Sequence, residues 1–147
     1  MLVKIKVKHG QEQNFQGIPI QPEWILEGNP GGKGQLMMQS HDRKQTTGIW
    51  ECDAGKFEYH YHWHETLRIL EGEATMEDDD GVAHLLRPGD YAHFPMGVKS
   101  IWTVPERLKL LFFIVTPEPF ELWRQDKFIN AVQDNPLPIK TDNNSKC

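Results

Sequence analysis

Residues 35–115 consist of short apolar runs, and a turn-forming group separates each run from the next. Runs spaced about 8–12 residues apart are typical of an all-β sandwich or barrel. Successive side chains of a strand point to opposite faces, so several short strands can each bury one face in a shared core. We therefore predict an all-β barrel over residues 35–115, with turns at residues 53–55, 71–72, 78–81, 87–90 and 95–97.

The turn at residues 78–81 predicts a hairpin. Asp80 and Gly81 lie between the runs 74–76 and 82–86, and Asp-Gly is a dipeptide that tight two-residue turns favour. The three aspartates at 78–80 lack the ligand spacing of an EF-hand loop. They therefore indicate a solvated turn rather than a cation site.

The segments that flank the predicted barrel follow other patterns. Residues 1–8 alternate apolar residues with lysines, which predicts a strand with one face in water. Residues 11–34 are rich in Gly, Pro and Gln and predict an irregular arm, so residues 1–34 are expected to pack on the barrel. Thr116 precedes Pro117 and Glu118, a typical helix start. Apolar residues at helical spacing then predict a C-terminal helix over residues 116–133 and a flexible tail over 134–147 of this single domain.

The composition narrows the class of partner. The 147 residues carry a net charge of −5, which does not provide the basic surface that nucleic acid binding requires. The longest apolar run, residues 108–115, is interrupted by Lys109 and is too short to span a bilayer. The two cysteines have no C-x-x-C spacing. We therefore expect a cytoplasmic protein without a disulfide framework that binds neither nucleic acid nor membrane.

The chemically richest stretch is EYHYHWHE, residues 58–65. It holds three of the seven histidines, at alternating positions directly before Glu65. Because strand side chains alternate, a shift of one residue exchanges the face that holds the histidines with the face that holds the aromatic residues. The register of this stretch therefore decides the chemistry of the site.

Residues 48–113 resemble the cupin superfamily of small β-barrels. As in the first cupin motif, Glu65 is followed by six residues and then Gly72. Residues 89–104 resemble the second motif, G-x5-P-x-G-x2-H-x3-N, with Ser100 and Val104 in place of its histidine and asparagine. A narrower resemblance, to the ureidoglycine aminohydrolase-type cupin domain, rests on residues 22–30, 48–51, 55–57, 65–66, 70–72 and 95–102.

The resemblance implies a jelly-roll barrel, or double-stranded β-helix, whose mouth holds a ligand or a metal ion. It also implies a homodimer, since small cupins commonly pair, often by exchanging N-terminal strands. The strand predicted at residues 1–8 and the predicted C-terminal helix are the expected interface.

Two registers of residues 58–65 fit the family pattern. Counting back from Gly72 places Tyr59, Tyr61, Glu65 and Ser100 at the four ligand positions of the family. Two phenols, one carboxylate and one hydroxyl form a poor site for a divalent metal, which prefers imidazole, carboxylate or thiolate. This register instead favours hydrogen bonding and stacking on a small polar molecule.

A shift of one residue produces Glu58-x-His60-x3-His64, the spacing that ureidoglycine aminohydrolases use for manganese. These three side chains would form a site for Mn, Fe, Zn or Ni. The shift breaks the spacing to Gly72 unless a bulge absorbs one residue. The two registers differ on whether the site binds a divalent metal, so the sequence alone does not assign a cofactor.

Three functions correspond to these readings. The first is a small cupin enzyme, a hydrolase, isomerase or lyase, that acts on a polar small molecule by acid/base chemistry with Glu65 at a raised pKa. The second is a metal-dependent cupin enzyme, and the third is a non-catalytic ligand-binding or sensor module. The candidate catalytic residues are Glu65, His62 and Tyr61, and the candidate ligand-binding residues are Tyr59, His93, Ser100 and Trp102.

Overall fold

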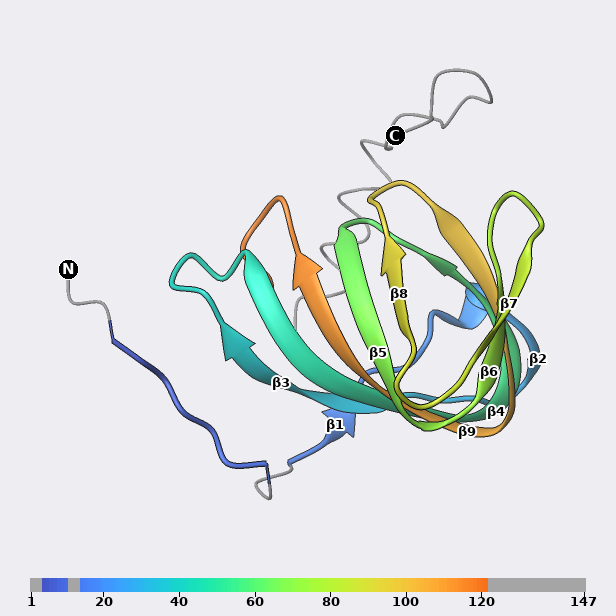
Figure 1. Ribbon diagram of the computed structural model, residues 1–147, viewed down its shortest axis with the longest axis horizontal. Coiled ribbons are helices and arrows are strands. Elements are labelled where there is room, and N and C mark those ends of the chain that lie inside the picture. The colour runs from blue at the N-terminus through green and yellow to red at the C-terminus, as the bar shows by residue number, and fades with distance from the viewer. Residues whose placement is uncertain (1–3, 11–13, 122–147) are drawn as a thin grey trace.

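The computed structural model describes residues 4–10 and 14–121, and they form an antiparallel sheet of nine strands that curves around a common interior (Figure 1). Its path runs in the order β1-β3-β4-β9-β5-β8, while β2 pairs with β4, and β6 pairs with β7 and β9. The elements are β1 (Gln16–Gly17), the 3-10 helix η1 (Pro22–Trp24), β2 (Ile25–Gly28), β3 (Lys33–Gln39), β4 (Gln45–His60), β5 (His64–Gly72), β6 (Ala74–Glu77), β7 (Ala83–Leu86), β8 (Tyr91–Phe94) and β9 (Lys99–Val115).

The two longest strands, β4 and β9, hold the barrel together. They pair from Gln45 opposite Val115 to His60 opposite Lys99. Successive halves of β4 pair with β3 and β2, and successive halves of β9 pair with β5 and β6. Each long strand therefore belongs to both sides of the barrel, and this is the all-β barrel that the sequence predicts.

Residues 53–55 do not form the predicted turn. They lie inside β4, where the pairing with β9 shifts between Asp53 and Gly55. The chain continues as a strand because β9 supplies a partner on both sides of this bulge, which absorbs the extra residue.

The predicted hairpin is confirmed by the pairing of β6 with β7. In its turn the Asp78 amide donates to the Val82 carbonyl at 2.9 Å. The Asp78 carboxylate accepts hydrogen bonds from the amides of Asp80 and Val82 at 2.9 and 3.0 Å. The Asp78 side chain therefore stabilises the turn.

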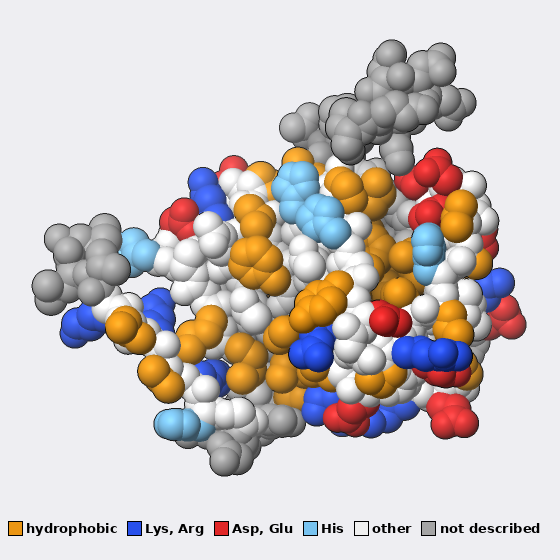
Figure 2. Space-filling model, in the orientation of Figure 1, with side chains coloured by type: hydrophobic (Ala, Val, Ile, Leu, Met, Phe, Trp, Pro, Cys, Tyr) orange, Lys and Arg blue, Asp and Glu red, His pale blue; other side chains and the backbone are white. Residues whose placement is uncertain are grey.

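The strand predicted over residues 1–8 is not formed in its described part. Residues 4–9 run away from the barrel (Figure 1) without ladder pairing, and Ile5 and Val7 are 94% and 76% exposed. Hydrophobic and basic side chains alternate along this arm (Figure 2). A strand forms only when its backbone groups find a partner strand, and the rest of the described chain does not provide one.

The predicted C-terminal helix is also absent from its described part. Residues 116–121 are not helical, and Phe120 is instead buried against the barrel at 4% exposure. The rest of that predicted helix and the predicted tail over 134–147 lie outside the described residues.

The interior is filled by the alternate side chains of the long strands. In β9 the buried positions alternate with more exposed ones on both sides of residues 105–107. Each fully buried aliphatic or aromatic side chain contributes about 1.5–3 kcal/mol to folding. The buried residues of β9 are Ser100, Trp102, Val104, Leu108, Leu110, Phe112 and Ile114.

Candidate functional site

The register of residues 58–65 directs the aromatic residues into the barrel. Tyr61 and Trp63 are 2% and 3% exposed, and Glu65 is 8% exposed. Tyr59 lies on the same face, and the alternate residues 58, 60, 62 and 64 point away from it. The structure therefore has the register obtained by counting back from Gly72, with Tyr59, Tyr61 and Glu65 on the interior side.

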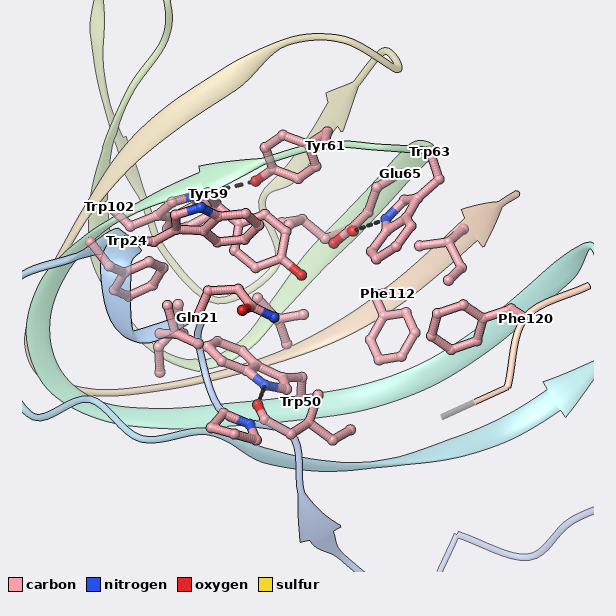
Figure 3. A pocket seen from close by; sticks show the side chains of 18 of the residues that line it. Gln21, Trp24, Trp50, Tyr59, Tyr61, Trp63, Glu65, Trp102, Phe112 and Phe120 are labelled. Atoms are coloured by element: carbon pink, nitrogen blue, oxygen red, sulfur yellow. Dashed lines mark hydrogen bonds between the residues drawn. The ribbon is translucent and has the colours of Figure 1, made fainter. Parts of the chain in front are cut away.

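These side chains line a cavity between the barrel and residues 18–24 of the arm (Figure 3). The cavity offers about 70 Å³ to the centre of a water-sized sphere. Its wall is mostly apolar, with a few polar groups, which is the usual character of a small-molecule site. It is lined by Ile18, Pro19, Ile20, Gln21, Trp24, Leu36, Trp50, Phe57, Tyr59, Tyr61, Trp63, Glu65, Leu67, Trp102, Leu108, Leu110, Phe112, Ile114 and Phe120.

Glu65 is the one carboxylic acid among the described residues of this lining. Burial raises the pKa of its carboxyl group from 4.5 to about 7, although a hydrogen bond from Trp63 acts in the opposite direction. The Trp63 indole N–H donates to Glu65 Oε1 at 2.9 Å. Near neutral pH the group is therefore present both as an acid and as a base, and one of its oxygens is held in place.

The two tyrosines differ in where their hydroxyl groups point. The hydroxyl of Tyr59 faces the same space as the Glu65 carboxyl group (Figure 3). Tyr61 Oη accepts hydrogen bonds from Ser100 Oγ at 3.3 Å and from Trp102 Nε1 at 3.2 Å. Burial, followed by the nearby charge of Glu65, raises the pKa of both phenols. Both tyrosines therefore stay neutral over the physiological range and can donate hydrogen bonds.

Three further residues of the site were not identified as candidates from the sequence. Gln21, on the arm, directs its amide into the cavity (Figure 3), and Phe120 closes the cavity from beyond the last strand. Trp63 holds Glu65. The alternation that places Tyr61 and Glu65 inside also predicts Trp63 inside, so a signal for it existed. Gln21 and Phe120 lie in segments without a strand period and left no such signal.

His62 does not line the cavity. Its neighbours Tyr61 and Trp63 point inward, so its ring points away and lies half-buried near Trp24, with 6.4 Å between the ring centroids. Its Nδ1 atom is buried and has no hydrogen-bond partner among the described residues. Burial, with a smaller effect of the nearby His60, lowers the pKa of the His62 imidazole.

Two of the predicted ligand-binding residues also lie outside the cavity lining. His93 is exposed because its neighbour Phe94 occupies the inward position of β8, and its ring contacts Thr66 Oγ1 at 2.8 Å. Ser100 is buried behind Tyr61, and its hydroxyl accepts a hydrogen bond from Trp102 Nε1 at 2.9 Å. Trp102 and Tyr59 do line the cavity.

The three residues of the metal-binding register do not form one cluster, because only His60 and Glu58 are in contact. His60 Nε2 lies 3.1 Å from Glu58 Oε2, and the His60 ring stacks on Trp24. His64 Nδ1 instead accepts a hydrogen bond from the Met96 amide at 3.1 Å. In the part of the chain that the structure describes, no three His, Cys, Asp or Glu side chains are grouped closely enough to hold a metal ion. Inside the cavity, two phenols and one hydrogen-bonded carboxyl group do not fit a divalent metal either.

The comparison with protein families supports a cupin barrel. Residues 39–109 match the family model described as the EutQ-like cupin domain. This segment is therefore similar to the EutQ-like cupin domain. Comparison with curated proteins gives no match. Within the described residues, no helix is both long and apolar enough to cross a membrane.

Solved structures share the fold at low sequence identity. A protein of unknown function from Pseudomonas syringae pv. tomato superimposes with a TM-score of 0.64 at 14% identity, over 71% of this chain and 46% of that one. A RmlC-like cupin from Shewanella frigidimarina gives 0.59 at 17% identity, over 80% and 94%. The EutQ protein of Clostridium difficile gives 0.53 at 14% identity, over 67% and 81%. At these identities the likeness supports the fold alone.

Proposed function

We propose that this cupin domain binds a small molecule with an apolar body and a carbonyl group, and moves a proton next to that carbonyl as an isomerase or lyase. The observation that carries the proposal is the pairing of Glu65, whose pKa is about 7, with the Tyr59 hydroxyl across an apolar cavity. A carboxyl group of this kind is poised to act as an acid or a base at neutral pH.

The size and lining of the cavity define the class of ligand. A buried water needs about 10–15 Å³ on this measure of volume, so the cavity has room for a small organic molecule rather than a large one. Stacked and edge-on aromatic rings suit an apolar body. The polar groups of Glu65, Tyr59 and Gln21 suit one hydrogen-bonding end (Figure 3).

The proposed reaction begins with the Glu65 carboxylate, which takes a proton from the carbon next to the substrate carbonyl. As that bond breaks, negative charge develops on the carbonyl oxygen, and the neutral Tyr59 hydroxyl stabilises it by donating a hydrogen bond. If the substrate has a C=C bond next to the enolate, the protonated Glu65 returns the proton to the far carbon of that bond, and the C=C bond shifts into conjugation with the carbonyl, which completes an isomerisation. If the β-carbon instead bears a leaving group, a C=C bond forms as that group departs with the bonding electrons and takes the proton from Glu65, which completes an elimination. Gln21 binds the polar end of the substrate throughout.

Trp63 has a supporting part in this scheme. Its indole N–H occupies Glu65 Oε1, which leaves Oε2 as the oxygen that exchanges the proton with the substrate. A manganese-dependent aminohydrolase reaction receives no support, because His64 does not join the Glu58–His60 pair and is instead hydrogen-bonded to the Met96 amide.

Exchange of substrate hydrogen for deuterium tests the proposal directly. The protein is incubated in D2O with a panel of small ketones and oxo acids, and loss of the C–H signal next to the carbonyl is followed by NMR. The wild-type protein is expected to accelerate exchange for at least one member, and Glu65→Gln is expected to lose at least 100-fold of this rate, the lower bound for a general base.

Glu77→Gln is the matched control, because Glu77 is exposed on β6 and lies outside the cavity. It should exchange like the wild type. Binding of panel members without any catalysed exchange would instead indicate a non-catalytic binding module. Exchange that persists in Glu65→Gln would show that another group is the base.

A further inference from the structure

We infer that Phe120 is the end wall of the cavity and that the size of this side chain sets the length of the ligand. The inference rests on the proposed function, since it concerns the ligand of the same cavity. It assigns a specificity-determining role to a residue that follows the last strand of the barrel rather than to a residue of the barrel itself.

Phe120 meets the cavity at the end opposite Trp24. Its ring is 4% exposed and packs edge-on against Trp63, with 5.6 Å between centroids and 79° between the planes. In Figure 3, Phe120 and Phe112 lie on one side of the cavity, while Trp24 and Trp102 lie on the other. Glu65 lies between the two ends, beside Trp63. A ligand whose polar group meets Glu65 therefore extends its apolar body either toward Trp24 or toward Phe120.

The position of Phe120 is set by contacts outside the cavity. Its amide donates to the Arg43 carbonyl at 2.8 Å, and its carbonyl accepts from Gln39 Nε2 at 2.8 Å. The Thr116 amide donates to the Lys44 carbonyl at 2.8 Å, and the Arg43 guanidinium pairs with the Glu121 carboxylate. Residues 116–121 are therefore clasped to the turn between β3 and β4.

This turn is itself a defined structure. The Asp42 carboxylate accepts hydrogen bonds from the Ser40 hydroxyl at 2.6 Å and from the Lys44 amide at 3.0 Å. Arg43 is the one non-glycine residue among the described positions with a positive φ, at 59°. A left-handed backbone is unfavourable for a residue with a Cβ, and here it accompanies two contacts that hold residues 116–121: those of the Arg43 carbonyl and guanidinium.

The contacts that hold residues 116–121 and the group that closes the cavity are thus separate parts of one segment. The backbone of Phe120 is held by the turn, and only its side chain enters the cavity. A shorter side chain at this position lengthens the cavity and leaves the backbone contacts with the turn in place, so a longer ligand can occupy the space gained. A larger side chain at the same position shortens the space.

A series of straight-chain methyl ketones, from butan-2-one to nonan-2-one, measures the length of the cavity. Binding is followed by NMR through the Trp63 indole N–H signal. Each added CH2 should tighten binding about fourfold, which is about 0.8 kcal/mol, until the chain meets the wall and the gain stops. For Phe120→Ala we expect this break to move to ketones at least two carbons longer, and for Phe120→Trp we expect it to move to shorter ones.

Phe120→Trp keeps the site filled, so the comparison does not depend on how well Phe120→Ala folds. Leu86→Ala is the control, because Leu86 is a buried core residue of β7 that does not line the cavity. Its break should stay at the wild-type length. The inference is overturned if the break is the same in the wild type and both Phe120 variants.

The ketone series and the deuterium exchange fail independently. A shifted break without catalysed exchange would contradict the proposed reaction and support the role of Phe120. Exchange that depends on Glu65, with an unmoved break, would do the reverse. If no ketone binds to the wild type or to Phe120→Ala, both the ligand class and the end wall are contradicted.

Discussion

At the scale of single residues, the site depends on how burial and the neighbouring Trp63 change the pKa of Glu65. The barrel removes its carboxyl group from water, and this raises the pKa to about 7. Trp63 opposes the shift by donating a hydrogen bond to one carboxyl oxygen. Glu71, on the same strand, is exposed, and its pKa is lowered by a hydrogen bond from Arg107 and by the nearby Lys109. Two glutamates of β5 thus have pKa values shifted in opposite directions, because one is buried and the other is exposed beside cations.

The burial of Glu65 predicts a specific dependence of stability on pH. The folded protein binds the Glu65 proton between pH 4.5 and about 7, where the unfolded chain has released it. The free energy of unfolding should therefore fall as pH rises through this window, by about 3 kcal/mol. Glu65→Gln should lack this fall. Urea unfolding of both proteins from pH 4.5 to 8.5 measures the difference, and a difference that does not change with pH would contradict the assignment.

Trp63→Phe should move the titration of Glu65 upward. The substitution keeps an aromatic ring but removes the N–H that stabilises the carboxylate, so the pKa of Glu65 should rise further, by about one unit. Carbon-13 NMR of the Glu65 carboxyl group gives the midpoint. Trp50→Phe is the matched control, because the Trp50 indole donates to the Ile18 carbonyl rather than to an acid. An equal shift in the two variants would show that the Trp63 hydrogen bond is not the cause.

At the scale of elements, the barrel depends on where its strands end and how closely they approach. Gly72 ends β5 with a φ of 77°, a conformation that favours glycine. A Cβ at this position would lie 1.9 Å from the Arg107 carbonyl oxygen on β9. The motif glycine therefore permits both the turn and the close contact of β5 with β9.

Two glycine substitutions separate these effects. Gly81→Ala places a Cβ at a φ of 84° with no heavy atom within 4 Å, so it should cost about 1–2 kcal/mol of backbone strain alone. Gly72→Ala adds a clash with backbone and should cost several kcal/mol. Urea unfolding of both variants measures the two costs, and equal losses would show that the contact with β9 relaxes freely.

At the scale of the whole molecule, residues 4–9 have no partner strand within the described chain, and their contact with the barrel is a hydrogen bond from the Lys6 ammonium to the Gln39 carbonyl at 3.2 Å. Residues 4–9 leave the barrel with exposed Ile5 and Val7 between lysines (Figures 1 and 2). Exposed backbone of this kind can pair with another strand. The homodimer that the cupin resemblance implies would provide that strand from a second copy.

The dimer is a prediction for light scattering at micromolar concentration. The wild type is expected to have the mass of two chains, and the double variant Ile5→Lys and Val7→Lys that of one chain, because charge replaces the apolar face of the arm. Val82→Lys and Leu85→Lys form a control pair, since both residues are exposed on the β6–β7 hairpin. A wild-type protein with the mass of one chain would contradict the prediction.

The barrel, its hairpin and the interior positions of Tyr59, Tyr61 and Glu65 could be predicted from the sequence. The barrel and its hairpin follow from a local rule: turn residues end strands, and side chains alternate along them. Alternation left two registers open for residues 58–65, and the cupin spacing from Glu65 to Gly72 favoured the one that the structure has. Alternation also explains two errors, because His62 and His93 neighbour inward-facing residues and therefore point away from the cavity. The strand at residues 4–8 and the turn at residues 53–55 were predicted wrongly, because each depends on whether a partner strand is present.

The contributions of Gln21 and Phe120 were decided by the tertiary structure alone. They come from segments far apart in the chain, and no periodicity relates them to Glu65. Phe120 reaches the cavity because the turn at Arg43 holds its backbone, and Glu65 has a pKa near 7 because distant strands together exclude water from it. Alternation is a property of neighbouring residues, so the sequence reports it, whereas burial is produced by the assembled barrel and appears only when the chain has folded.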